Sequence, residues 1–432
     1  MDSSSGDLSE EITAHLTPSL LAHAEKQMNE ALERRKIRFG DGLLPTFPLP
    51  FFVLSPELAR WKQQSEHLVS AVEQIAQEAL TDDSLYSALG LRPDAKPFLE
   101  IDPGYRRVTM LSRPDALITQ DGVVFVEFNC DSPAMMAFSD AVTECLLEID
   151  LLSRFRDRIR SEQMTLQLLE TLLGCYREYG GKVWPPTVAI TDWPGQKTRY
   201  EHQEIARVFE QAGYPTVVCD PRAFQKVDGR LEVEGRTIHL VYRRALFLEL
   251  LDRQSEVGAL LSAYRDGTIC MVNSLRSYLA SSKMLFAHLS DNPSLLPDRT
   301  VAQTIRVTAQ NHGQLRQDKD RWVLKRAESH GGEHVLLPNL AEESHWAQAW
   351  EDARSSTWVA QRYHSVPTMT VRRSHQNDLI SERKYFNWNP FLFAGRYAGG
   401  IARASETPLI SITRGGGLLP TISYEKATRE SR

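Results

Sequence analysis

The sequence predicts a mixed α/β fold, in which helices and strands alternate along much of the chain. Residues 187–242 alternate between apolar runs of strand length and a helical segment, in the order strand, helix, strand. Such spacing is typical of a parallel sheet with helices packed against it. From about residue 100 to 140 apolar residues recur at every second position instead, which is the periodicity of a strand. With roughly 150 residues per domain, a chain of 432 residues can form two to four folding units.

Helices are predicted before and after the period-two region. One helix near residues 20–32 carries an apolar stripe of Leu20, Leu21, Ala24, Met28, Ala31 and Leu32. Others are predicted over Glu57–Leu80, over residues 141–178, and over Leu275–Leu289. Within the α/β region we expect strands at 187–191, 216–219 and 238–242, a helix at 201–212, and a hairpin about Asp228-Gly229. Further strands are predicted at residues 322–337, around a glycine pair, and at 358–364.

The composition excludes several classes of protein. Apolar residues make up 42% and charged residues 25% of the chain, which excludes a collagen, a coiled coil and a largely disordered chain. The net charge is −6, so no surplus of positive charge exists to neutralise the phosphates of a nucleic acid. The five cysteines form no CxxC pair, which disfavours a disulfide framework and a cysteine zinc site. Neither a signal peptide nor a membrane-spanning run is evident, so the expectation is a cytoplasmic protein.

Residues 112–129 are predicted to form a β-hairpin. Two β-rich runs flank Gln120-Asp121-Gly122, and a three-residue loop with Gly122 in the left-handed conformation is a favoured connection. In that register Thr119 pairs with Val123, and the pairs Asp115–Glu127 and Arg113–Asn129 follow. A two-residue turn would instead put the two carboxylates on opposite faces.

In the predicted register the two faces of this hairpin differ in chemistry. One face carries Arg113, Asp115, Glu127 and Asn129, because side chains alternate along a strand. The other face carries Ala116, Ile118, Val124, Val126 and Phe128. Two carboxylates and an amide oxygen are a hard ligand set suited to Mg²⁺, and an arginine beside it can hold a phosphate. The alternative is a solvated strand face with ordinary cross-strand ion pairs.

The motif Arg113-x-Asp115, followed after eleven residues by Glu127-x-Asn129-x-Asp131-Ser132-Pro133, resembles the metal-site motif of the glutathionylspermidine synthase-like, circularly permuted ATP-grasp proteins. In ATP-grasp ligases the acidic motif ordinarily follows the nucleotide-binding lysines. Here it comes first, and candidate lysines follow more than 150 residues later, which is the permuted order. After Pro133 the chain has Ala134-Met135-Met136, where those relatives often carry glycine.

Later segments agree with this resemblance. Residues 273–289 are similar to the helix that bears the first nucleotide-contacting lysine, here Lys283. Residues 322–325 are similar to the next strand of the nucleotide site, with Lys325, and Gly331-Gly332 to the glycine-rich flap that follows it. Residues 358–363, with Gln361 and Tyr363, are similar to the hinge that holds adenine, and residues 393–403 to the closing strands, with Arg403 facing the phosphates. Each residue alone has an ordinary alternative: a solvated lysine, a turn, a plain strand residue or a structural salt-bridge partner.

The resemblance implies a circularly permuted ATP-grasp fold with a pre-ATP-grasp α/β domain. We divide the chain accordingly into a helical N-terminal region (1–100), the metal-site hairpin and helices of the core (101–184), the pre-ATP-grasp-like substrate domain (185–270), the nucleotide-binding region (271–424) and a tail (425–432). In the substrate domain Arg243 and Arg244 are candidates to contact a carboxylate, with a structural role as the alternative.

The activity implied is that of an ATP- and Mg²⁺-dependent ligase, which joins a carboxylate to an amine through an acyl phosphate. Lys283, Lys325 and the flap would hold the ATP phosphates, and the acidic set would hold Mg²⁺. Arg113 would hold the acyl phosphate, with Arg403 as a second clamp. A phosphotransferase on the same fold and a non-catalytic nucleotide-binding scaffold remain alternatives. The expected partners are small-molecule carboxylate and amine substrates, and a homodimer is an option that the sequence does not decide.

Overall fold

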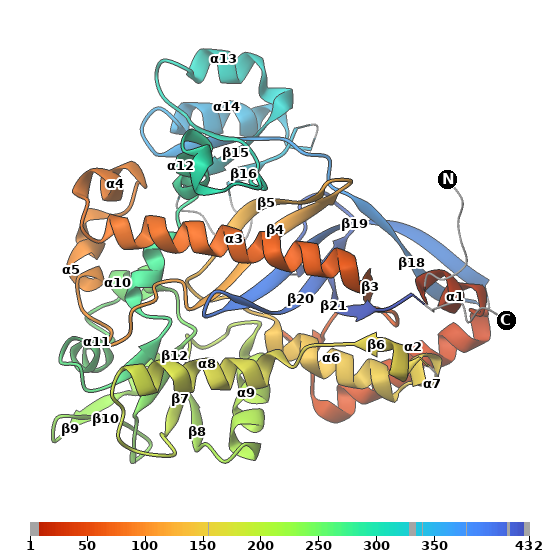
Figure 1. Cartoon of the computed structure of the whole chain (residues 1–432), viewed down its shortest axis with the longest axis horizontal. Helices are drawn as coiled ribbons and strands as arrows, with labels where there is room; N and C mark the ends of the chain where they lie inside the picture. Colours follow the sequence, from red (N-terminus) through yellow and green to blue (C-terminus); the bar gives the residue numbers. More distant parts are fainter. Residues whose placement is uncertain are drawn as a thin grey trace.

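A mixed eight-stranded sheet forms the centre of the molecule in the computed structural model (Figure 1). The structure describes residues 8–153, 155–327, 334–338, 340–376, 378–412 and 415–426. The strand order of the central sheet is β3-β21-β20-β19-β4-β5, with β18 paired to β19 and β6 to β21. The bounds are β3 Phe51–Leu54, β4 Leu111–Thr119, β5 Gly122–Asn129, β6 Ile159–Arg160, β18 Thr368–His375, β19 Asp378–Phe393, β20 Arg396–Ser405 and β21 Gly417–Tyr424.

Helices cover both faces of this sheet. The long α3 (Ser55–Ala79) runs across one face, where its Trp61 lies 5.2 Å from the ring of Trp388 on β19 (Figure 1). The helices α2 (Pro18–Arg35), α6 (Met136–Glu148) and α8 (Met164–Glu178) belong to a second hydrophobic cluster, together with Phe391 and Phe393 of β19. Trp61 and Trp388 belong to the first cluster, together with Leu392 of β19. Because neighbouring residues of a strand point to opposite faces, Leu392 and its neighbours Phe391 and Phe393 place the two clusters on opposite sides of the sheet. The predicted stripe of α2 is buried except for Leu20, which is half-buried.

A four-stranded parallel sheet confirms the predicted strand–helix–strand region. Its order is β13-β12-β7-β8, with bounds Cys270–Val272, Leu240–Arg243, Val188–Thr191 and Thr216–Cys219. The helix α9 (Arg199–Gln211) connects β7 to β8, and α10 (Phe247–Asp252) and α11 (Gly258–Arg265) connect β12 to β13. The predicted hairpin is formed by β9 (Gln225–Val227) and β10 (Arg230–Val233), and β11 (Arg236–Thr237) completes a small sheet.

A third sheet, of order β14-β17-β15-β16, stands at the top of Figure 1. Its strands are Thr304–Arg306, Trp358–Arg362, Trp322–Arg326 and Val335–Leu336. On one face Leu324 and Ala360 pack with α13 (His312–Gln317) and with Trp346 and Trp350 of α14 (Glu343–Asp352). The alternate residues, among them Lys325, point to the other face and to the cavity described below.

The prediction of one helix over Leu275–Leu289 is wrong. A 3₁₀ helix (η4, Leu275–Ala280) is followed by a break, and α12 (Met284–Asp291) starts only after Lys283. The Ser282 hydroxyl donates to the carbonyl of Leu89 at 2.6 Å and accepts from the backbone N–H of Met284 at 3.2 Å. Serine side chains that bond to backbone groups compete with helical hydrogen bonds, which explains the interruption.

The domain boundaries given above stay predictions, and residues 427–432 of the tail lie outside the described residues.

Among the helices that the structure describes, none is long and apolar enough to cross a membrane. The N-terminal elements also include α1 (Leu8–Ala14), β1 (Arg38–Phe39), β2 (Gly42–Leu43), α4 (Asp83–Ala88), α5 (Lys96–Leu99) and α7 (Asp150–Ser153).

Candidate active site

The turn of the β4–β5 hairpin is one residue shorter than predicted. Thr119 pairs with Gly122 and not with Val123, so only two residues connect the strands. Gly122 has a φ of +123°, a backbone conformation that favours glycine. If the register continued unchanged from this turn, the carboxylates of the two strands would point to opposite faces.

A β-bulge corrects this offset before the site is reached. The register shifts by one residue just after Asp115, where Val126 is the extra residue of β5. Beyond the bulge Asp115 pairs with Glu127, and Arg113 pairs with Asn129. The predicted polar pairs are therefore confirmed, although the hairpin reaches them by a different turn.

The bulge also changes which residues face the core. Val123 and Phe125 are buried in the hydrophobic core, whereas Val124 is half-buried and Val126 lines the cavity. The prediction that Val124 and Val126 lie on the apolar face is wrong, because the extra residue inverts the alternation on the turn side of the bulge. Val126 has no pairing partner on β4, and its carbonyl accepts a hydrogen bond from Lys325 Nζ at 2.9 Å.

Asp115 joins the hairpin to the neighbouring strands of the central sheet. This residue is 7% exposed, and its Oδ2 accepts from Arg403 Nη2 at 2.5 Å, while its Oδ1 accepts from Asn129 Nδ2 at 3.3 Å. Arg403 Nε in turn donates to Asn389 Oδ1 at 2.9 Å and to Asn387 Oδ1 at 3.3 Å. The salt-bridge alternative for Arg403 is therefore correct for this structure, and a contact of Arg403 with phosphate stays a prediction.

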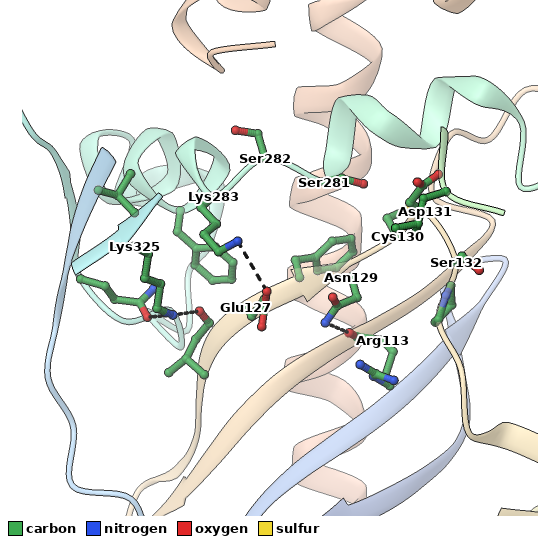
Figure 2. A pocket seen from close by; sticks show the side chains of 17 residues that line it. Arg113, Glu127, Asn129, Cys130, Asp131, Ser132, Ser281, Ser282, Lys283 and Lys325 are labelled. Carbon is green, nitrogen blue, oxygen red and sulfur yellow. Dashed lines mark hydrogen bonds and ion pairs between the residues drawn. The ribbon is translucent and has the colours of Figure 1, made fainter. Parts of the chain in front are cut away.

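Arg113, labelled in Figure 2, forms an ion pair with Asp115 and has hydrogen-bonding capacity to spare. Its Nη1 donates to the carbonyl of Ala134 at 3.0 Å, and its Nε is 3.7 Å from Asp115 Oδ1. Among the described residues no acceptor lies within hydrogen-bonding distance of Nε, which is buried. Burial lowers the pKa of this guanidinium, and the charge of Asp115 acts in the opposite direction.

Lys283 approaches Glu127 from the break before α12, as Figure 2 shows. Its Nζ is 3.8 Å from Glu127 Oε1, and the lysine side chain is only 10% exposed. Burial lowers the pKa of Lys283, and the negative charge of Glu127 opposes this shift. The alternative of a solvated helix lysine is therefore wrong for this residue.

Lys325 is buried beside neutral partners. It is 7% exposed, and its Nζ donates to Gln361 Oε1 at 2.7 Å in addition to the Val126 carbonyl. Gln361 is held in turn, because its Nε2 donates to Thr304 Oγ1 at 3.1 Å. None of the ion pairs found in the described part of the chain involves Lys325, and burial lowers its pKa to about 8. The negative charges of Glu127 and Asp115 oppose this shift without reversing it, so a negatively charged ligand would stabilise the buried ammonium further.

Two adjoining cavities share these groups. The larger, of about 170 Å³, has largely apolar walls on the side of the third sheet, formed by Leu117, Val323, Val335, Leu337, Val366 and Leu409. The smaller, of about 110 Å³, lies on the side of the parallel sheet and is lined by Ser132, Pro133, Leu246, Ser281, Ser282 and Phe286. An apolar slot next to clustered cations suits a nucleobase and its phosphates, with room for a second small molecule beyond them.

The structure brings together nine of the eleven predicted site residues. All nine line the larger cavity: Arg113, Asp115, Glu127, Asn129, Lys283, Lys325, Gln361, Tyr363 and Arg403. The other two, Gly331 and Gly332, lie outside the described residues. The individual role of each residue stays a prediction.

Sequence reasoning missed the residues that hold these side chains in place. Asn387 and Asn389 orient Arg403, and Thr304 orients Gln361. The spacing of the two asparagines by two residues within a long strand places them on one face, so this pair was visible as a period-two signal. The partner of Gln361 lies 57 positions away, and no local pattern predicts it.

The oxygen atoms at the predicted metal site suit Mg²⁺. Asn129 uses its Nδ2 as a donor to the carbonyl of Arg113 and to Asp115, which leaves its Oδ1 without a described donor. Glu127 is 30% exposed and faces the cavity. Hard oxygen ligands, together with waters and phosphate oxygens, are what Mg²⁺ prefers. In the described residues no group of three or more His, Cys, Asp or Glu side chains gathers, so a closed all-protein metal cage is absent from that part of the chain.

Arg243 and Arg244 have structural partners. Arg243 is 1% exposed, and its Nη2 donates to Asp131 Oδ1 at 2.6 Å. Arg244 Nη1 donates to the carbonyl of Pro133 and, at 3.2 Å, to Tyr242 Oη. These contacts favour the structural alternative for both arginines, which tie the parallel sheet to the loop after β5.

Comparisons with known proteins bear on the fold. No protein-family model matches the sequence, and no curated protein sequence matches it. Among solved structures, the chain is similar to a glutathione synthetase-like effector from Globodera pallida in its apo form, with 12% identity, 96% of this chain and 99% of that chain covered, and a TM-score of 0.62.

Two other solved structures overlap parts of the chain. One is the ATP-grasp ligase PsnB, complexed with a minimal precursor, Mg and ADP, at 12% identity over 56% of this chain and 90% of that chain, with a TM-score of 0.31. The other is D-alanyl-alanine synthetase A from Vibrio cholerae, at 10% identity over 48% and 68%, with a TM-score of 0.29. These two TM-scores are too low to bear on the fold.

The first likeness extends over nearly the whole of both chains, so this chain has the fold of the glutathione synthetase-like effector. This confirms the predicted α/β class, and the likeness to a glutathione synthetase-like protein agrees with the predicted ATP-grasp type of fold. The permuted order of the motifs is not tested by it and stays a prediction.

Proposed function

We propose that this protein is an ATP- and Mg²⁺-dependent ligase that joins a carboxylate to an amine through an acyl phosphate. The observation that carries the proposal is Lys325, a buried ammonium whose hydrogen-bond partners among the described residues are neutral, at a cavity that Lys283 and Arg113 also line. Burial lowers the pKa of all three cations, Arg113, Lys283 and Lys325. Three cations around one cavity suit a polyphosphate ligand.

The two cavities would divide the substrates between them. The adenine would lie against the apolar wall beside Gln361 and Tyr363, with its phosphates at Lys283 and Lys325. Asp115, Glu127 and Asn129 would hold Mg²⁺, which when bound supplies positive charge at the β- and γ-phosphates. The smaller cavity, on the far side of Lys283 from the apolar wall, would hold the carboxylate substrate.

The proposed reaction has two steps. A carboxylate oxygen attacks the γ-phosphorus of ATP, the bond to the β–γ bridging oxygen breaks, and ADP leaves. The amine nitrogen then attacks the acyl carbon, the carbon–oxygen bond to phosphate breaks, and the ammonium proton passes to solvent. Arg113, which lines both cavities, would donate hydrogen bonds to the phosphoryl oxygens in the first step and to the oxyanion in the second.

The test is ADP release from Mg-ATP across a panel of amino acids, small peptides and polyamines, with mass detection of products. The proposal predicts ADP formation that requires a carboxylate–amine pair, and a product whose mass is the sum of the pair less one water. A phosphorylated product without an amide would favour the phosphotransferase alternative. If no pair reacts, Mg-ATP binding is measured directly. Binding without turnover would favour the scaffold alternative, and failure to bind would contradict the proposed nucleotide site.

The affinity for Mg-ATP is expected to fall as the pH rises through about 8. ATP phosphates favour the ammonium form of Lys325, whose pKa in the unliganded protein is lowered by burial to about 8. Below that pH the ammonium is already present, and above it binding must take up a proton, so affinity falls by up to about tenfold per pH unit. Titration calorimetry in buffers from about pH 7.5 to about pH 9.5 measures this, with Lys325→Arg as the control because a guanidinium does not titrate there. Equal affinity across the range in the wild type would contradict the assignment of Lys325.

A further inference from the structure

The loop between β5 and α6 makes the hydrogen bond that orients Arg113. The carbonyl of Ala134 accepts from Arg113 Nη1 at 3.0 Å, which is the one hydrogen bond of that guanidinium among the described residues. The direction in which Arg113 points therefore depends on where the Ala134 carbonyl is held.

The loop itself is strained at the next residue. Met135 has a φ of +91°, a region that residues with a side chain rarely adopt, and such a conformation persists only when its surroundings enforce it. Met135 is also the N-cap residue of α6, and its side chain makes no capping hydrogen bond. Something outside the loop must therefore supply the missing acceptor.

Glu201 of α9 supplies it. This residue is fully buried, and its Oε1 accepts from the backbone N–H of Met135 at 2.7 Å and from that of Ala137 at 3.3 Å. A carboxylate at the N-terminal end of a helix is favoured by the helix dipole. Its Oε2 lies 3.8 Å from Arg244 Nη2, and Arg244 holds the carbonyl of Pro133 in the same loop.

We propose that Glu201 is a positioning residue for Arg113, which acts by fixing the strained Met135 and with it the Ala134 carbonyl. The inference rests on the proposed function only for its consequence in catalysis. Glu201 lines neither of the two cavities, so its proposed effect on the active site is indirect. Through Glu201, the helix α9 beside the parallel sheet would help to orient a cavity-lining arginine.

A matched control is available in Asp140. It caps α8 from another helix in the same manner, since its carboxylate accepts from the backbone N–H groups of Met164 at 3.1 Å and Thr165 at 2.6 Å. Asp140 makes no described hydrogen bond to Arg113 or to the loop after β5. A purely structural cap predicts the same outcome for Glu201→Gln and Asp140→Asn, whereas a positioning role predicts different outcomes.

The decisive readout is the Nε–H signal of Arg113 in an NMR spectrum of the full chain labelled with ¹⁵N-arginine, assigned by its loss in Arg113→Lys. In Glu201→Gln the new amide donors face the guanidinium of Arg244, so the loop is expected to move and the Arg113 signal to shift or broaden. Asp140→Asn is expected to leave it in place. An unchanged Arg113 signal in folded Glu201→Gln would overturn the proposal.

Two further measurements keep the inference testable. Met135→Gly relieves the positive φ, so it should fold while loosening the loop, and it is expected to broaden the same signal even if Glu201→Gln does not fold. In the ligase assay Glu201→Gln is expected to lower kcat about ten- to hundredfold with KM for ATP little changed, because the lysines are untouched. If the wild type shows no ATP-dependent reaction, the proposed function fails, and the NMR signal still decides the positioning role.

Discussion

Replacing Lys325 by methionine is expected to weaken Mg-ATP binding by roughly a hundredfold and, at the same time, to raise the melting temperature. Charge-assisted hydrogen bonds to phosphate contribute about 1.5–3 kcal/mol each, so their loss weakens binding by roughly a hundredfold. Burial lowers the pKa of Lys325 from 10.5 to about 8, which means that folding at neutral pH costs about 3 kcal/mol through this group. That cost is complete below pH 8 and disappears above the unfolded-state value. Methionine fills a similar volume without the charge, although Gln361 and the Val126 carbonyl lose a donor.

Lys384 offers a matched control for this prediction. It is also 7% exposed and lies in a strand, but it pairs with Glu382 at 2.8 Å and with Glu406. These carboxylates raise the pKa of Lys384, so Lys384→Met is expected to lower the melting temperature and to leave Mg-ATP binding unchanged. Binding is measured by titration calorimetry and stability by thermal unfolding. Mg-ATP binding of wild-type strength in Lys325→Met would show that the buried ammonium is not part of the nucleotide site.

The substitution Glu127→Ala is expected to abolish turnover while leaving the fold largely intact. It removes the carboxylate that faces the cavity, 3.8 Å from Lys283 Nζ, and with it one of the three proposed ligands of Mg²⁺. The loss of one preorganised electrostatic contact at a reacting phosphate typically lowers kcat by about 10² to 10³. The side chain is 30% exposed, so its removal leaves no sealed cavity and the cost to stability is small.

A second carboxylate–lysine pair provides the control for Glu127→Ala. Glu162 lies 3.0 Å from Lys62, with both side chains more than a third exposed. Glu162→Ala removes a comparable pair away from the cavity and is expected to retain full activity. ADP release by the two variants, at saturating and at limiting Mg²⁺, separates them. Full activity in Glu127→Ala would refute the metal-site assignment.

The polar face of the hairpin was predictable from sequence, but the path of the chain to it was not. The motif fixes which residues pair beyond Asp115, and the structure confirms those pairs. A three-residue loop and a two-residue turn followed by a bulge at Val126 lead to the same register there, so the spacing alone cannot distinguish them. The difference decides which carbonyl is free to accept from Lys325.

Burial was the second feature that the sequence did not show. On sequence alone Lys283 and Lys325 read as surface lysines, because a lysine in a short strand or near a helix is normally solvated. Their burial results from the third sheet lying against β5, which brings together residues almost 200 positions apart. The same holds for Glu201, whose capping of α6 is a contact between helices of different units.

The parallel sheet was the most predictable part of the fold. Apolar runs of strand length separated by an amphipathic helix are a local signal, and β7, α9 and β8 follow it within two residues. The helix over Leu275–Leu289 failed for a tertiary reason, since Ser282 bonds to Leu89 in a distant segment. That break places Lys283 at the start of α12, where it faces Glu127.

The measurement that tests the central claim most directly follows ¹⁸O from the carboxylate into phosphate. The acid of the reactive pair is labelled with ¹⁸O in its carboxyl group, and the phosphate released in the presence of Mg-ATP and the amine is analysed by mass spectrometry. The proposed acyl phosphate predicts one ¹⁸O atom in phosphate for each amide formed. Amide formation with unlabelled phosphate would contradict it.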